Sequence, residues 1–381
     1  MRPLASYRVA LFLPTLRGGG AERNFLRLAQ GLAARGIDVT VVVAQTGGPN
    51  QAWVPEDVRF VDLEVRLLPV AAAPLARYLR RDRPDILLSA LNGANVAALA
   101  ARSLARVDMP VVVTERNTLT AWVRGARGFQ NRWLIPWLVR RFYPRADAIV
   151  GVSRGVADDL AQFLGLPSER ILSIPNPVVD ARLEEMASES IPIEWDTRIG
   201  DAPLVISVGR FVPQKDHELL LRSFREVCER VPDARLALLG DGDERERIDR
   251  LIDELDLRDS VDVVGFQANP YAWMARADVL ALSSRFEGLP TVLIEALACG
   301  ARVVSTDCPS GPREILEHGR WGRLVPVADR EALADALVAS LQEGRWNCPM
   351  VEALGPYTAA EVVTAYMSQV RRLVPGPNVR H

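Results

Sequence analysis

Short apolar runs alternate with amphipathic stretches along most of the chain. In the first half, Val-, Ile- and Leu-rich runs predict strands at 7–13, 38–44, 85–91, 110–116 and 147–153. The stretches between them, such as 21–36 and 93–106, carry apolar residues at helical spacing. Continuous apolar strands separated by helices are typical of parallel sheets covered on both faces. The pattern therefore predicts a doubly wound α/β domain in this half.

The alternation stops over residues 170–203, where several prolines and mixed charges predict a linker. It then restarts, with strands predicted at 203–211, 234–240, 260–266, 277–283 and 301–307. Helices are predicted at 216–231, 243–255, 270–277, 290–300 and, last, 356–374. The sequence thus predicts two doubly wound domains, whose ligands are expected in a crevice at the carboxyl ends of the strands.

Composition narrows the class of protein. The 381 residues suit two domains of roughly 100–200 residues each. With 49% hydrophobic and 25% charged residues and a net charge of −2, nothing indicates nucleic acid as a partner. No apolar run reaches the roughly 18–20 residues of a membrane span, and we interpret the apolar start as a buried strand in a cytoplasmic protein. Scattered cysteines and only three histidines argue against a metal site.

Three loops carry candidate chemistry, and the first holds three glycines, Gly18, Gly19 and Gly20, before a helix predicted from Ala21. Their backbone can approach an anion at the helix N-terminus, although a plain flexible turn explains them equally well. In the second loop, Arg210 and Lys215 precede a helix capped by Asp216. Two cations beside a helix N-terminus suit a diphosphate, and ordinary surface charges are the alternative.

The third loop, "SSRFEGLPTVLIEALACG", places Glu287 and Glu295 eight positions apart. Pro290 predicts that a helix begins near 289 or 290, so Glu287 lies on the approach loop and Glu295 inside the helix. The backbone N–H groups of 289–292 then form an anion site. A ligand with a diphosphate between two hydroxylated rings matches this arrangement. A chance pair of solvated glutamates stays open, and a two-carboxylate hydrolase fits less well.

A basic aromatic segment spans residues 124–145, with six arginines, no acid and five aromatic residues. Such a segment can lie at the surface of an anionic membrane. Pro136 predicts a kinked or two-piece helix. An ordinary helix with core aromatics and solvated arginines is the alternative. The residues expected to contact a membrane are Arg132, Trp133, Trp137, Arg140 and Arg141.

Together these stretches resemble the retaining glycosyltransferases of family 4, which have the GT-B fold. The resemblance is carried by "RGGGAE", "VGRFVPQKD", "LLGDGDERERI", "VVGF" and the E-x7-E stretch, and it spans nearly the whole chain. It implies two Rossmann-like domains facing each other across a crevice. Residues 1–178 would bind the acceptor and 179–355 the nucleotide sugar, while 356–381 would hold a helix crossing back to the first domain.

The resemblance also implies roles for residues. Arg210 and Lys215 would bind the donor diphosphate, and Glu287, the third catalytic residue, would hold the transferred sugar. Glu295 would hold the ribose. The donor-binding residues expected on this basis are Gly19, Gly20, Gly209, Arg210, Lys215, Gly265, Phe266, Glu287, Gly288, Leu289, Pro290, Thr291 and Glu295.

The reaction implied is the transfer of a hexose or N-acetylhexosamine from a nucleotide sugar, UDP-linked by the family's preference, with retention and without metal or cofactor. Arg210, Lys215 and the helix end would neutralise the leaving diphosphate. A departing phosphate oxygen would take the proton of the incoming hydroxyl.

One departure concerns the acceptor. Many relatives carry a histidine where this chain has Glu115, Arg116 and Asn117 in "TERN". That stretch is similar to a subgroup that extends oligosaccharides on polyprenyl diphosphate, including N-acetylgalactosamine transferases. The acceptor contacts expected are Gly18, Glu22, Glu115, Arg116 and Asn117. A lipid-linked glycan as acceptor would put the enzyme on the inner face of the cytoplasmic membrane.

Three other functions stay open at this stage. A soluble enzyme of the same fold, a transferase or sugar-nucleotide epimerase, could act on a small molecule. A non-catalytic nucleotide-binding module is the second. A nicotinamide oxidoreductase is the third, although the G-x-G-x-x-G fingerprint is missing.

Overall fold

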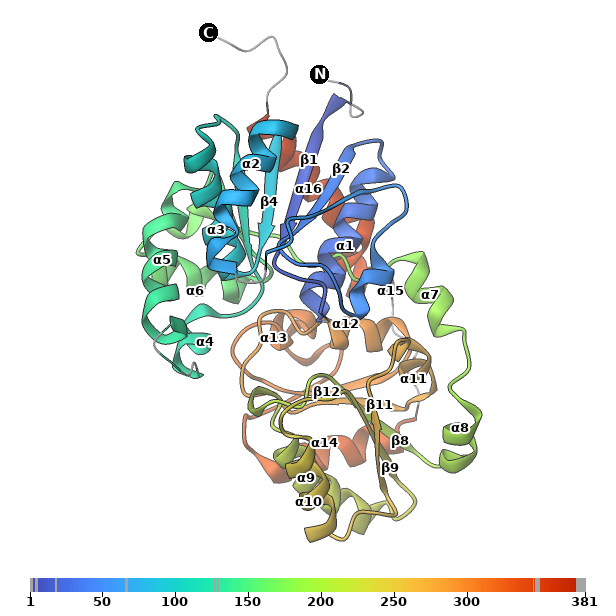
Figure 1. Cartoon of the computed structure of the whole chain (residues 1–381). Coiled ribbons are helices and arrows are strands. Elements are labelled where there is room, and N and C mark those ends of the chain that lie inside the picture. Colours follow the sequence, from blue (N-terminus) through green and yellow to red (C-terminus); the bar gives the residue numbers. More distant parts are fainter. Residues whose placement is uncertain are drawn as a thin grey trace. The chain divides into compact units, whose positions relative to one another are not determined.

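The computed structural model describes residues 3, 6–17, 19–65, 68–125, 128, 130–344, 346 and 350–374. The chain forms two compact units: Met1–Pro177 with Tyr357–His381, and Val178–Pro356. Each unit is built on one sheet whose neighbouring strands are all parallel (Figure 1). No helix in the part of the chain that is described is long and apolar enough to cross a membrane.

The first unit holds a seven-stranded sheet in the order β3-β2-β1-β4-β5-β6-β7. The five predicted strands are confirmed, and β3 and β7 are added. The strand β3 was missed because it is short, polar at both ends and only partly buried. The strands are β1 (Arg8–Leu13), β2 (Asp38–Val43), β3 (Arg59–Asp62), β4 (Ile86–Ala90), β5 (Val111–Glu115), β6 (Ala148–Gly151) and β7 (Ile171–Ser173).

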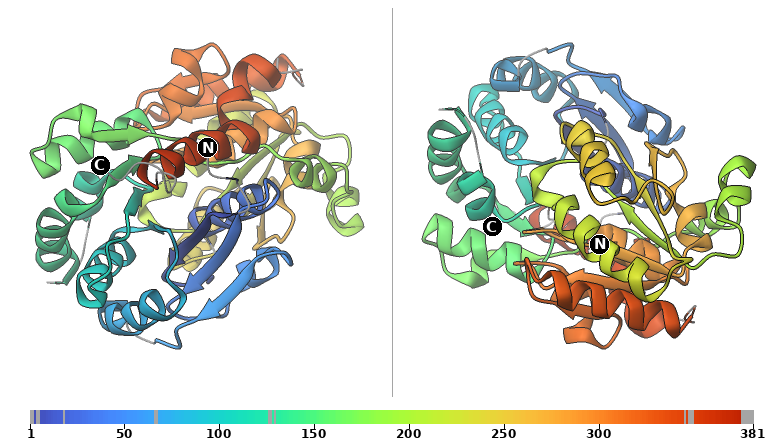
Figure 2. Two further views of the ribbon diagram at one scale, coloured as in Figure 1. Left: turned by 90° about the horizontal axis from the view of Figure 1, so that it is seen from above. Right: turned by 90° about the horizontal axis from the view of Figure 1, so that it is seen from below.

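Seven α-helices of the first unit are described: α1 (Gly20–Ala33), α2 (Ala72–Asp82), α3 (Asn92–Ala105), α4 (Leu119–Gly125), α5 (Ile135–Phe142), α6 (Arg154–Leu164) and α16 (Ala359–Leu373). The last helix, red in Figures 1 and 2, packs against α1 although more than 300 residues separate them. The Arg35 guanidinium, just after α1, donates to Thr364 Oγ1 and to the Ala360 carbonyl, each at 2.7 Å.

The second unit holds a six-stranded sheet in the order β10-β9-β8-β11-β12-β13. Its five predicted strands are confirmed, and the short β13 is added. The strands are β8 (Leu204–Val208), β9 (Arg235–Leu239), β10 (Val261–Gly265), β11 (Val279–Leu282), β12 (Arg302–Thr306) and β13 (Arg323–Val325). The helices described are α7 (Ala181–Ala187), α8 (Ile193–Ile199), α9 (His217–Arg230), α10 (Arg245–Glu254), α11 (Pro270–Arg276), α12 (Thr291–Ala298), α13 (Pro312–Ile315), α14 (Arg330–Gln342) and α15 (Met350–Leu354).

The prediction of a linker over 170–203 is wrong in part, because this stretch contains β7, α7 and α8. Its polar residues and prolines mark the ends of short elements. Asp180 caps α7 by accepting a hydrogen bond from Leu183 N, and Pro192 lies directly before α8. Trp195 of α8 packs edge-on against the buried Trp273, with ring centroids 6.0 Å apart. β7 therefore belongs to the first unit, and the part of the stretch from Val178 onward is packed onto the second.

Both sheets reverse their strand order once, between β1 and β4 in the first unit and between β8 and β11 in the second. At such a reversal the two loops that leave the carboxyl ends of neighbouring strands diverge to opposite faces, which opens room for a ligand. The loops after β8 and β11 contain the predicted Arg210, Lys215 and Glu287. Of the predicted glycines, Gly19 lies directly before α1 in the loop after β1, and Gly20 is the first residue of α1.

The packing of α16 on α1 depends on the missing side chain of Gly31. A Cβ built at Gly31 would lie 2.4 Å from Val363 Cγ2, and valine has little freedom to turn away inside a helix. We expect Gly31→Ala to lower the free energy of unfolding by about 1–3 kcal/mol, measured by urea denaturation. Gly125→Ala, where no atom lies within 4 Å, is the matched control. Equal stability of the two variants would contradict this packing, and Val363→Ala should restore part of the loss.

Candidate active site

The loop after β8 is fixed by its neighbours while its first cation points into solvent. Gly209 N donates to the Leu239 carbonyl at 2.9 Å. Gly240 approaches so closely that a Cβ there would lie 1.8 Å from the Gly209 oxygen. Its φ of 148° also favours glycine. Arg210 is exposed, and within the described chain no ion pair engages its guanidinium. This cation is therefore available to a ligand.

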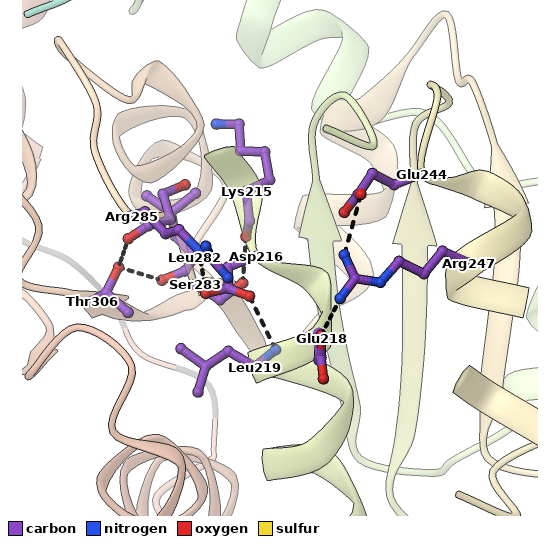
Figure 3. A network of polar contacts seen from close by, with 11 residues as sticks. Lys215, Asp216, Glu218, Leu219, Glu244, Arg247, Leu282, Ser283, Arg285 and Thr306 are labelled. Carbon is purple, nitrogen blue, oxygen red and sulfur yellow. Dashed lines mark hydrogen bonds and ion pairs between the residues drawn. The ribbon is translucent and has the colours of Figure 1, made fainter. Parts of the chain in front are cut away.

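The loop after β11 is joined to the loop after β8 by a set of polar contacts (Figure 3). Ser283 Oγ donates to the Lys215 carbonyl at 2.7 Å, and Arg285 N donates to the Gln214 carbonyl at 2.9 Å. The Arg285 guanidinium donates to Asp216 Oδ2 at 2.8 Å. The prediction that Asp216 caps the following helix is confirmed, since its Oδ1 accepts from Leu219 N, at 3.5 Å. These contacts fix the backbone from which Lys215 extends.

A partly buried ion pair joins the two loops. Lys215 Nζ lies 2.6 Å from Glu287 Oε1, and Ser284 Oγ donates to the same oxygen at 2.6 Å. The Lys215 side chain points away from the Arg285–Asp216 pair (Figure 3). Glu287 is only 6% exposed, so removing its cation would leave a buried charge without that partner, which is costly. The structure therefore brings the predicted Lys215 and Glu287 together.

The helix α12 begins at Thr291, within two residues of the predicted start, and no side chain of the described residues caps its N-terminus. The residues before it, Gly288, Leu289 and Pro290, are buried. A Cβ at Gly311, whose φ is 91°, would lie 2.4 Å from Pro290 Cδ, so the turn is tightly packed. The backbone N–H groups at this end are therefore not occupied by a side-chain cap from the described part of the chain, as an anion site at a helix N-terminus would require.

Glu295 lies inside α12 and is 6% exposed. The Tyr271 hydroxyl, from α11, approaches Glu295 Oε1 at 3.5 Å. Sequence reasoning missed Tyr271, because nothing in the sequence links α11 to α12. Gly265, with φ 85°, ends β10, and its carbonyl accepts from Gly240 N. Phe266, the next residue, exposes its ring.

In the first unit, the predicted glycine loop is tied to Glu22. Gly18 lies outside the described residues. A Cβ at Gly19 would lie 2.5 Å from Glu22 Oε2, so this carboxylate covers the backbone directly before α1. Gly20 is exposed. An anion approaching this helix end would meet the negative charge of Glu22, which has to move first.

A cavity of about 270 Å³ lies at the carboxyl edge of the first sheet. The predicted Glu115, Arg116 and Asn117 line it, together with residues from the loops after β1 and β4. The other lining residues are Pro14, Leu68, Leu91, Asn92, Gly93, Leu119 and Trp122. Three of the five expected acceptor contacts are therefore brought together, whereas Glu22 is not among the lining residues and Gly18 lies outside the described residues.

Glu115 is held by two neutral side chains that sequence reasoning did not select. Tyr143 donates from its hydroxyl to Glu115 Oε1, and Asn95 Nδ2 donates to the same oxygen at 3.2 Å. Asn95 Nδ2 also lies 2.9 Å from the Tyr143 hydroxyl. Burial raises the pKa of Glu115 to about 7, although these hydrogen bonds act in the opposite direction. Only the third dimension brings Asn95 and Tyr143 together, from α3 and from the turn after α5.

Arg116 turns its guanidinium into the first unit. It donates to Asn176 Oδ1 and lies over the ring of Phe25, 5.2 Å from the centroid. Burial lowers its pKa from the ordinary value, while nearby Tyr366, Glu115 and Glu22 oppose this shift. Arg116 is thus part of the wall of the cavity.

The basic aromatic segment contains two helical pieces, as Pro136 predicts: a π-helical turn over Gln130–Leu134 followed by α5. Trp133 and Trp137, four residues apart, are 63% and 60% exposed, and Arg132 and Arg141 are exposed beside them. Arg140 is exposed too, but its guanidinium donates to the Phe163 carbonyl at 3.2 Å and covers that ring.

Tyr143 differs from the two exposed tryptophans of this segment. It is buried and turned inward to Glu115, because it follows Pro136 and Val139 on the inner face. Phe129 lies outside the described residues. Within the described ranges, no group of three or more His, Cys, Asp and Glu side chains is arranged to hold a metal ion.

Comparisons with known proteins bear on the family to which this chain belongs. Residues 192–358 match the family "Glycosyl transferases group 1", and residues 18–182 match "Glycosyltransferase Family 4". The chain is 28% identical over 348 residues to a Campylobacter jejuni N-acetylgalactosamine-N,N'-diacetylbacillosaminyl-diphospho-undecaprenol 4-alpha-N-acetylgalactosaminyltransferase, covering 89% of this chain and 91% of that one. It is 29% identical over 367 residues to the lipopolysaccharide core biosynthesis glycosyltransferase LpsE of Rhizobium meliloti, covering 92% and 95%.

Among solved structures, Anabaena HepE in complex with UDP and glucose superposes with a TM-score of 0.78, at 20% identity, covering 96% of this chain and all of that one. That likeness concerns the fold. Two family matches, which together span most of the chain, and relatives aligned along nearly its full length make the assignment specific. The chain belongs to the family 4 glycosyltransferases and has their GT-B fold.

Proposed function

We propose that this glycosyltransferase moves a hexose or N-acetylhexosamine, with retention, from a UDP-sugar to a glycan carried on polyprenyl diphosphate. The observation that carries the proposal is the Lys215–Glu287 pair between the loops after β8 and β11. It lies at the point where the second sheet reverses its strand order. A movable cation and a buried carboxylate there suit a diphosphate joined to a sugar.

In this proposal Arg210, Lys215 and the N-terminus of α12 neutralise the charge that develops on the leaving diphosphate. Arg210 offers a planar fork and Lys215 a point charge already positioned by Glu287. Glu287 accepts hydrogen bonds from the transferred sugar, and Glu295 from the ribose. The bond from the anomeric carbon to the phosphate oxygen breaks as the bond to the acceptor oxygen forms. The departing phosphate oxygen takes the acceptor proton, so no metal or cofactor is required.

The lipid-linked acceptor is supported by two observations. The Campylobacter jejuni relative is named for transfer to a glycan on diphospho-undecaprenol. The cavity in the first unit is lined by Glu115, Arg116 and Asn117, and its volume of about 270 Å³ suits a sugar ring. UDP as the nucleotide is supported by HepE, which was solved with UDP and glucose.

Contact with a membrane belongs to the same proposal. Trp133, Trp137 and Arg141 succeed one another at intervals of four, so they share the outer face of the segment. Pro136 and Val139 occupy the opposite, buried face. Exposed tryptophans beside arginines, without any acid from 124 to 145, complement an anionic lipid surface. We therefore propose a peripheral enzyme on the inner face of the cytoplasmic membrane.

The first test is nucleotide release from UDP-, GDP- and ADP-sugars, with and without an N-acetylgalactosamine-terminated glycan on undecaprenyl diphosphate. We expect release from a UDP-sugar, strong stimulation by the lipid-linked glycan, no effect of EDTA, and an α-linked product by NMR from an α-linked donor. Release that ignores the lipid would favour a soluble acceptor. No release from any donor would favour a non-catalytic nucleotide-binding module.

The two glutamates are expected to act on different steps. Glu287→Ala should lower kcat by about 10²–10³-fold and leave the Kd for UDP, measured by calorimetry, nearly unchanged. Glu295→Ala should raise that Kd by roughly tenfold or more, since a hydrogen bond to a charged group contributes about 1.5–3 kcal/mol. Glu254→Ala, an exposed glutamate of α10, is the control. Equal behaviour of the two site variants would contradict the division of roles.

The membrane contact is tested by sedimentation with phosphatidylcholine vesicles, with and without phosphatidylglycerol. Trp133→Ser with Trp137→Ser should abolish binding to the anionic vesicles. Arg132→Gln with Arg141→Gln should weaken binding and remove most of its salt dependence, since each arginine contributes about 1 kcal/mol near such a surface. Arg140 is left intact because it binds Phe163. Leu104→Ser, which removes another exposed apolar side chain, is the control. A double Trp variant that sediments like this control would contradict the proposed membrane contact.

A further inference from the structure

The cavity of the first unit presents a carboxylate whose two oxygens have different surroundings. Both side-chain donors, Tyr143 and Asn95, reach Oε1 of Glu115. Among the described residues no side chain donates to Oε2. Glu115 lines the cavity, although only 4% of it is exposed. The backbone N–H of Arg116 also donates to this carboxylate. Oε1 thus belongs to the protein's own side-chain network, and Oε2, which has two lone pairs, can accept a hydrogen bond from a molecule in the cavity.

We propose that Glu115, in its ionised form, accepts a hydrogen bond from a hydroxyl of the acceptor sugar, and that Tyr143 and Asn95 are positioning residues that hold it ionised. This inference rests on the proposed function, because it names how the same acceptor is recognised. Glu115 contacts the acceptor and removes no proton; the proton of the reacting hydroxyl still leaves with the phosphate.

Geometry restricts what Glu115 can do. Asn95 Nδ2 donates to the Thr114 carbonyl at 2.9 Å, which anchors this amide to β5 itself. Tyr143 then donates to Glu115 while Asn95 contacts its hydroxyl, so the carboxylate cannot rotate without losing both donors. A carboxylate fixed in this way presents one acceptor position at one orientation. Such a group selects a hydroxyl by its direction, which suits recognition of one sugar stereoisomer.

The charge of Glu115 depends on few groups. Among the described residues, the titratable or charged groups that face it are Tyr143, from the turn after α5, and Arg116, the next residue on the chain. Burial raises the pKa of Glu115 to about 7, and both neutral donors favour the ionised form. Burial also raises the pKa of Tyr143 well above its ordinary value, so Tyr143 stays a donor throughout the neutral range. Acceptor binding should therefore improve as the pH rises through about 7.

The test compares pH profiles of acceptor kcat/KM, with undecaprenyl-diphosphate-linked glycan as the probe and acceptor-free hydrolysis of the UDP-sugar measured in parallel. For the protein without substitutions, acceptor kcat/KM should fall as the pH is lowered through about 7, giving an acid limb in the transfer profile. The rate of hydrolysis should show no such limb. Tyr143→Phe removes a donor to the carboxylate, raises its pKa and moves the limb to higher pH, so activity lost at pH 7 returns at higher pH. Glu115→Gln should abolish the limb and lower acceptor kcat/KM by about tenfold to a hundredfold.

A second measurement makes the outcome independent of the acceptor. With ¹³C-carboxyl glutamate labelling, the resonance lost in Glu115→Gln should titrate near pH 7 and shift upward in Tyr143→Phe. Tyr78→Phe, which removes a buried hydroxyl on α2, is the matched control and should leave both profiles unchanged.

Three results would overturn the inference: a limb that Tyr143→Phe does not move, a parallel loss of transfer and hydrolysis in Glu115→Gln, or a Glu115 carboxyl that titrates at its ordinary value. If hydrolysis persists but no lipid-linked glycan is extended, the proposed acceptor is wrong. The carboxyl titration then decides the ionisation of Glu115 alone.

Discussion

Parallel pairing of every strand is the constraint on which the rest of this structure depends. A parallel strand cannot be followed by a tight turn, so the chain returns through a helix each time and all carboxyl ends collect at one edge of the sheet. The order in which successive strands are added reverses once in each sheet, between β1 and β4 in the first and between β8 and β11 in the second. Residues far apart in the sequence meet at these reversals. The cavity of the first unit and the ion pair of the second both lie there.

The two edges use the same side chain in different electrostatic settings. Glu287 is buried against a lysine, whose positive charge compensates its own. Glu115 accepts hydrogen bonds from two neutral side chains and from the Arg116 backbone; burial raises its pKa to about 7, although these bonds and the Arg116 charge act in the opposite direction. Burial opposes the ionised form of Glu115, and the donors and the charge around it offset that burial only in part, so this carboxyl is close to balance near neutral pH. The first setting suits a fixed part of a phosphate site, and the second suits a contact that responds to its surroundings.

The features that could be predicted from the sequence are those that depend on residues close together in the chain. Ten strands with long apolar runs, the Asp216 cap and the start of α12 were predictable because each depends on neighbours in the chain. Short strands such as β3, β7 and β13 have too few apolar residues to give a periodic signal. Asn95, Tyr143, Tyr271 and Ser284 were missed for a different reason: an isolated polar residue carries no pattern until folding brings it to its partner. The prolines of 170–203 had two interpretations, and only packing distinguishes a linker from the ends of short helices.

Tyr143 also affects the orientation of α5, because it directly follows this helix, which carries the exposed Trp137. Its hydroxyl donates a hydrogen bond to the buried Glu115 carboxylate. This bond fixes the last turn of the helix to the core of the first unit. Turning α5 about its axis would withdraw that hydroxyl and remove one donor from a buried carboxylate, at a cost of about 1.5–3 kcal/mol. The outward direction of Trp137 is therefore an internal property of the fold. The exposed face of α5 can therefore contact a partner, but it cannot reorient to fit one.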